Sequence, residues 1–151
     1  MLSLPLPSEE FTYRVLPFQL HKNIGITLLI LLLMLLYIRI RNRPVPDVTV
    51  KQSPLPLKLA IIDHALLYLL IGACCISGYL SSSFSGWDTS FWLLLNLPGW
   101  GYEDDGLNML YSDIHLWTCW ALLAVIAVHI SAALYHGFSN DGVIKRMSPF
   151  D

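Results

Sequence analysis

Three long apolar segments alternate with polar stretches along this chain. They run from Phe18 to Ile40, from Leu59 to Leu80 and from Ile114 to Phe138. Each holds the roughly 20 residues that a helix needs to cross a bilayer. The pattern predicts an all-α fold, an integral membrane helical bundle with three transmembrane helices in a single domain covering residues 1–151.

The stretches between the apolar segments are predicted to be connections. Residues 1–17 form a proline-containing lead-in without a helical period, and residues 41–58 belong to a linker whose four prolines argue against a helix. The longest connection covers residues 81–112, and its apolar part, residues 91–100, is too short to span a membrane. We expect that part to lie in the membrane interface, anchored by its tryptophan rings.

Composition agrees with a membrane protein, because 55% of the residues are apolar and only 13% are charged. No cluster of basic and aromatic residues resembles a nucleic-acid surface, so we predict no nucleic-acid partner. The three cysteines form no CxxC motif and are interpreted as packing residues, not as ligands of zinc or of a covalently attached haem. The acidic run at residues 103–105 is interpreted as a solvated loop.

The distribution of charge predicts an orientation. The linker and the C-terminal tail are basic, whereas the loop at residues 81–112 carries four acids and no Lys or Arg. By the positive-inside rule, the linker at 41–58 and the C-terminus face the cytoplasm and the loop faces outward. Residues 1–17 would then also lie outside, although they do not resemble a signal peptide. Either this short tail crosses unaided, or a preceding membrane helix is absent from this sequence.

The third apolar segment holds three of the five histidines, His115, His129 and His136. The first two are fourteen residues apart, which places them on nearly the same face of a helix and about 21 Å apart along its axis. Imidazole inside lipid is costly and is retained when it binds a metal, relays protons or pairs with another polar group. The spacing is suited to two haem groups near opposite faces of a membrane.

Matching depths suggest which histidines meet. The first and third segments start on the same side, so His21 and His115 should lie at one level, where facing helices can supply two imidazoles to one haem iron. His64, near the start of the second segment, should lie at the level of His129. Each histidine could instead hydrogen-bond a neighbouring helix, and His64 beside Asp63 could serve proton transfer.

Two further positions have open interpretations. Gly25 lies four residues after His21 on the same face, where it would either let a planar ligand approach the backbone or serve helix packing. His136 would lie near the cytoplasmic surface, where a hydrated histidine needs no ligand.

Several stretches of the sequence resemble the bacterial cytochrome b561 family of membrane cytochromes, which is related to the cytochrome b subunits of nickel–iron hydrogenases. The most specific feature is the spacing His-x13-His-x6-His followed by DGVIKRMSP. The matching stretches are LHKNIG at 20–25, DHALLYLLIGACCISGYLSSSFSG at 63–86, DIHLWTCWALLAVIAVHISAALYHGF at 113–138 and DGVIKRMSP at 141–149. Together they cover nearly everything after Pro17.

The resemblance implies a four-helix bundle that holds two b-type haems. It implies that His21 and His115 are the axial pair of the outer haem and that His129 binds the iron of the inner haem. In the family the partner of His129 lies on an additional first helix, which this sequence lacks, so we expect an N-terminally truncated or mis-started member. The inner haem then has one protein ligand, or His64 as a substitute. The resemblance also places His64 and His136 near a quinone pocket.

The function that the resemblance implies is transmembrane electron transfer through b-type haem in the bacterial inner membrane. It would link a redox partner on the outer side to ubiquinone or another membrane quinone, without catalytic residues of its own. A quinone-linked oxidoreductase of the superoxide oxidase type is one form of this function. The alternatives are a membrane-anchor subunit for a dehydrogenase or hydrogenase, and a fragment that cannot hold both haems.

Overall fold

The computed structural model describes residues 9–42, 54–86, 89–92 and 94–138 of the chain. It contains three long helices, α1 (Glu9–Arg41), α2 (Pro54–Phe84) and α3 (Asp105–Phe138). All three are long and apolar enough to cross a membrane, which confirms the predicted all-α membrane bundle. The basic tail and residues 43–53 of the linker, on which part of the predicted orientation rests, lie outside the described residues.

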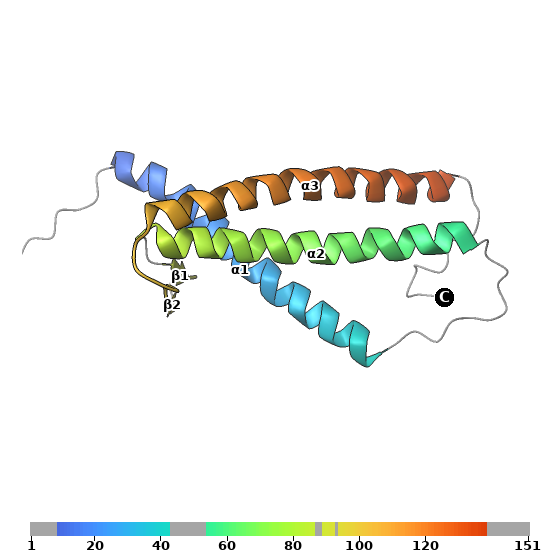
Figure 1. The fold of residues 1–151 in the computed structure, drawn as a ribbon, viewed down its shortest axis with the longest axis horizontal. Coiled ribbons are helices and arrows are strands. Elements are labelled where there is room, and N and C mark those ends of the chain that lie inside the picture. Colours follow the sequence, from blue (N-terminus) through green and yellow to red (C-terminus); the bar gives the residue numbers. More distant parts are fainter. Residues whose placement is uncertain (1–8, 43–53, 87–88, 93, 139–151) are drawn as a thin grey trace, which may run out of the picture.

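Helices α2 and α3 run side by side and antiparallel, while α1 crosses α2 near one end of the bundle and diverges from it towards the other (Figure 1). We call the end with the 85–104 connection the loop end, and the end where α1 stops and α2 starts the linker end. Helices α1 and α3 both start at the loop end, as the sequence predicted. Near the other end of α1, Arg39 contacts α2 by donating a hydrogen bond of 3.2 Å to the Tyr68 hydroxyl.

All three helices begin earlier than the apolar pattern predicted. Helix α1 starts at Glu9 within the predicted lead-in, and α2 starts at Pro54 within the predicted linker. The expectation that residues 41–58 contain no helix is wrong for 54–58, because proline is tolerated in a first helical turn, where the N–H groups lack partners. Helix α3 starts at Asp105, not Ile114, because Asp104 caps it, its Oδ1 accepting the Leu107 N–H at 2.9 Å.

The connection at the loop end contains a short hairpin, which was not predicted from the sequence. Strands β1 (Thr89–Phe91) and β2 (Leu95–Leu97) are antiparallel, with Phe91 opposite Leu95. At the tip, Trp92 has a φ of 47°, a left-handed conformation that costs a bulky residue about 1–2 kcal/mol. Two hydrogen bonds to α1 offset this cost. The Trp92 N–H donates to Asn23 Oδ1 at 3.0 Å, and the indole N–H donates to Thr27 Oγ1 at 3.1 Å.

Burial in this structure is the reverse of that in a water-soluble protein. Among the described residues no hydrophobic side chain is buried, whereas four polar ones are: Asn23, Ser77, Ser82 and Thr89. Large apolar side chains such as Leu69 and Trp117 are about 70% exposed along the helices. An apolar surface of this extent requires lipid around it. The buried side chains on the helices are therefore small and polar, as expected where lipid removes the hydrophobic drive for association.

We predict that Trp92→Phe lowers the free energy of unfolding by about 0.5–1.5 kcal/mol, because the indole bond to Thr27 is lost while the ring is kept. The measurement is reversible unfolding in mixed micelles. Trp100→Phe serves as the control, because that side chain is 72% exposed and should change stability less. Equal effects of the two substitutions would contradict the prediction.

Candidate functional site

At the loop end, the structure brings together the rings of His21 on α1 and His115 on α3. Their centroids lie 5.9 Å apart and their planes cross at 81°. Two imidazoles on opposite sides of one metal ion, with bonds of about 2 Å, have centroids roughly 6 Å apart. The spacing of this loop-end pair therefore fits a shared metal ion, such as a haem iron.

The orientation of His115 is fixed from its other nitrogen. Its Nδ1 lies 2.8 Å from the backbone oxygen of Cys74 on α2. A carbonyl only accepts, so Nδ1 carries the proton and Nε2 keeps the lone pair that a metal needs. Gly78 provides the space for the ring, because a Cβ at this position would lie 2.9 Å from Cε1 of His115. Hydrogen bonding of the non-ligating nitrogen is the usual support of a metal-bound histidine.

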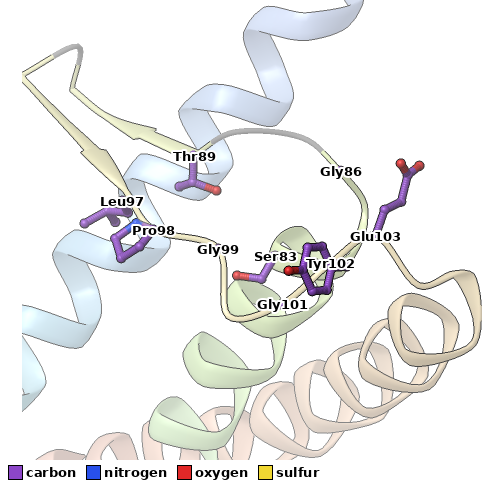
Figure 2. A pocket seen from close by; sticks show the side chains of 9 residues that line it. All are labelled: Ser83, Gly86, Thr89, Leu97, Pro98, Gly99, Gly101, Tyr102 and Glu103. Atoms are coloured by element: carbon purple, nitrogen blue, oxygen red, sulfur yellow. The ribbon is translucent and has the colours of Figure 1, made fainter.

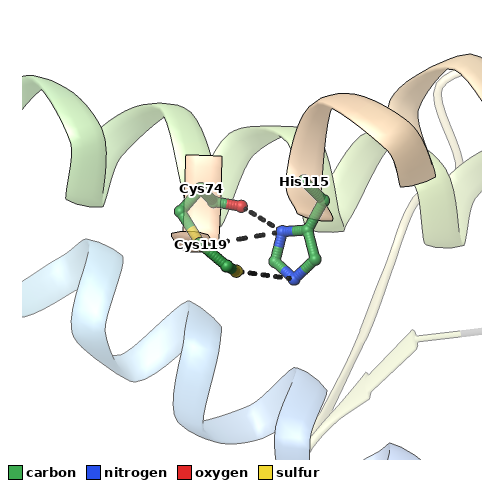
Figure 3. Close-up of side chains that lie close together, drawn as sticks. All are labelled: Cys74, His115 and Cys119. Carbon is green, nitrogen blue, oxygen red and sulfur yellow. Dashed lines mark hydrogen bonds between the residues drawn. The ribbon is translucent and has the colours of Figure 1, made fainter. Parts of the chain in front are cut away.

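Two cysteines stand beside the same ring (Figure 3). Cys74 Sγ lies 3.7 Å from Nδ1, Cys119 Sγ lies 3.7 Å from Nε2, and the two sulfurs are 3.1 Å apart. Two thiols and one imidazole form a soft donor set that also suits Zn²⁺ or Cu⁺. Such an ion would compete with haem for Nε2. No local motif in the sequence indicates this cluster, because its members come from two helices.

A cavity of about 570 Å³ adjoins the loop-end pair, which is within the usual range for cofactor sites. Gly25 belongs to its lining, and a Cβ added there would meet nothing within 4 Å. The open space argues against helix packing as the reason for this glycine and favours the approach of a planar ligand. The cavity lies between α1 and α2, with His115 on its α3 side.

At the linker end, His64 on α2 and His129 on α3 form a second pair, with ring centroids 5.4 Å apart and planes at 81°. His64 Nδ1 lies 2.7 Å from the oxygen of Ala60, and His129 Nδ1 lies 2.6 Å from Asp63 Oδ2. Carbonyl and carboxylate oxygens accept hydrogen bonds, so both histidines donate from Nδ1 and keep the lone pair on Nε2. The meeting of His64 and His129 follows the predicted depths.

The role of Asp63 differs from the one suggested by its place in the sequence. In the sequence Asp63 stands beside His64, whereas the structure pairs it with His129 on the facing helix. Adjacent residues on a helix point about 100° apart, so a neighbour in sequence is not a neighbour on the surface. The remaining histidine, His136, lies in the last turn of α3 with its ring centroid 5.6 Å from that of Tyr135.

A smaller cavity of about 380 Å³ lies within the loop-end connection, and its lining contains neither histidine nor cysteine (Figure 2). Glu103 borders it next to Gly86, whose φ of +72° suits only glycine. Of the acidic run, Asp104 therefore caps α3 and Glu103 lines this cavity. The cavity is separate from both histidine pairs.

Comparison with known proteins gives two matches. The sequence profile of the family described as prokaryotic cytochrome b561 matches residues 2–150. The protein named cytochrome b561 homolog 2 of Escherichia coli K12 is 32% identical over 131 residues, which cover 85% of this chain and 69% of that protein. No solved structure matches the chain.

Gly78→Ala is expected to displace the His115 ring, because the new Cβ would lie 2.9 Å from Cε1. We predict that the variant loses at least half of the haem bound at the loop-end pair, measured as haem per protein after purification. Gly72→Ala is the matched control on the same helix, because its Cβ would make an ordinary contact of 3.6 Å with Leu32. Retention of full haem content by Gly78→Ala would contradict this account of the ring's position.

Proposed function

We propose that this chain, which belongs to the prokaryotic cytochrome b561 family and has a membrane electron-transfer role with b-type haem, transfers electrons through two haems. One haem would be held by the loop-end pair and the other by the linker-end pair. His21 and His115 would hold one haem, and His64 and His129 the other. Haem supplies reversible one-electron uptake at its iron when bound. The protein supplies placement, orientation and the surrounding electrostatics.

The observation that carries the proposal is the geometry of the loop-end pair. Two imidazoles from separate helices have their ring centroids 5.9 Å apart, and the hydrogen bond from His115 Nδ1 to the Cys74 carbonyl leaves its Nε2 for a metal. The cavity beside the pair and the open space over Gly25 supply room for a planar group. Two histidines holding the haem iron would leave no open site for oxygen, which favours electron transfer over oxygen binding.

The ring and hydrogen-bond geometry of the linker-end pair supports the second haem. The rings of His64 and His129 have a similar separation and the same crossing angle, and each donates its Nδ1 proton to an acceptor in the protein. This arrangement favours His64 as the partner of His129 over a ligand from a further helix. Fourteen residues of continuous helix separate His115 from His129, so the two sites lie about 21 Å apart along α3.

We further propose an orientation and a partner at each end. Arg39, Arg41 and Lys58 lie at the linker end, which by the positive-inside rule faces the cytoplasm of a bacterial inner membrane. A membrane quinone would exchange electrons at that end, with His136 in the last turn of α3 as a candidate contact. A redox partner on the outer side would exchange electrons at the loop end.

Haem stoichiometry tests the assignment. Protein expressed with added haem should bind two haems, and His115→Ala and His129→Ala should each bind one, because each breaks one histidine pair. The double variant should bind none, as measured by reduced-minus-oxidised spectra and haem per protein. His136→Ala should keep both haems while it slows reduction by quinol.

An unchanged haem content in His115→Ala would refute the loop-end assignment. An unchanged content in His64→Ala, together with loss in His129→Ala, would show that the partner of His129 is a different group.

A further inference from the structure

The two histidine pairs differ in the group that accepts the Nδ1–H hydrogen bond of the histidine on α3. At the loop end, His115 donates to a neutral backbone carbonyl at 2.8 Å. At the linker end, His129 donates to a carboxylate, that of Asp63, at 2.6 Å. The two sites share a crossing angle of 81° and similar centroid distances, and they differ in the charge of this acceptor as well as in the two thiols that lie only beside His115.

Asp63 stands in an unusual place for a carboxylate. It is the only acidic residue of the apolar segment from Leu59 to Leu80. An ionised carboxylate within a membrane is expensive and persists when it is paired or hydrogen-bonded. The side chains of His129 and Asp63 are 34% and 22% exposed in the protein alone, on a surface that lipid would cover. The charge of Asp63 would therefore act on the neighbouring ring through a medium that screens it weakly.

We propose that Asp63 is a positioning residue that holds His129 towards His64 and lowers the reduction potential of the linker-end haem. This inference rests on the proposed function. An anionic acceptor draws the Nδ1 proton towards itself and makes Nε2 a stronger electron donor to iron. A nearby negative charge also stabilises the oxidised iron, which carries one more positive charge than the reduced iron. Both effects oppose the uptake of one electron at this site, whereas at the loop end the acceptor bonded to His115 Nδ1 is a neutral carbonyl.

The consequence for electron flow follows from the location of the carboxylate. By disfavouring the electron at the linker end, Asp63 biases the distribution of a single electron towards the loop-end haem. The proposed difference in reduction potential between the two sites thus comes from Asp63, which is not one of the four paired histidines.

The test is a redox titration of Asp63→Asn in the His115→Ala background, where the linker-end haem alone remains. Asparagine keeps the size and an accepting oxygen but removes the charge. We expect the equilibrium constant for reduction of this haem to rise at least tenfold, which equals about 59 mV for one electron. Asp63→Glu keeps the charge and should stay close to the parent. Asp105→Asn, which removes an exposed acid at the start of α3, is the control for net charge and should leave the potential unchanged.

The outcomes separate this proposal from the function on which it rests. Two haems in the wild-type protein with no shift in Asp63→Asn would overturn the role of Asp63 and leave the proposed function standing. Absence of a haem bound by His129 in the wild-type protein would overturn both. If Asp63→Asn fails to retain haem, the result for Asp63→Glu decides. Haem retained by Asp63→Glu at an unchanged potential supports the requirement for a negative charge at this position. Loss of haem in both variants overturns that requirement.

Discussion

A polar side chain inside a bilayer must find its hydrogen-bond partner within the protein, because no water is available there. This constraint organises the histidine sites. His115, His64 and His129 each donate Nδ1–H to an acceptor on a helix, respectively a carbonyl of α2, a carbonyl one turn earlier and the Asp63 carboxylate. Each bond that satisfies the ring also fixes its tautomer and direction. The same bonds that make imidazole tolerable in lipid therefore leave its other nitrogen ready for a metal.

Distances along the helix axes could be predicted from the sequence with simple arithmetic. The rise of about 1.5 Å per residue, together with the alternating directions of three spans, put His21 level with His115 and His64 level with His129. The structure places both pairs in ring contact. The three helices themselves followed from the apolar segments, because length and hydropathy decide whether a segment can cross a membrane.

The rotation of each helix about its own axis could not be predicted from the sequence in this way. Which face of α2 meets α3 depends on packing between segments distant in sequence, so the contacts of Asp63 with His129 and of Cys74 with Cys119 were missed. The helix starts at Glu9 and Pro54 were missed because hydropathy marks the part of a helix within lipid and not its extension beyond it. The hairpin was missed because its strands are only three residues long.

The attachment of Trp92 to α1 has a consequence for how this architecture can vary. Asn23 and Thr27 share one face of α1, and His21 lies about 200° from Asn23, nearly on the opposite face. Because the hairpin is hydrogen-bonded to one face of α1, it sets the rotation of this helix about its axis. That rotation determines the direction in which His21, on the other face, points relative to α3. Insertions and deletions in surface connections are ordinarily tolerated during evolution. In this protein a change of length between β1 and β2 would turn α1 and move the His21 ring relative to His115, so this connection should vary less than its position in the chain suggests.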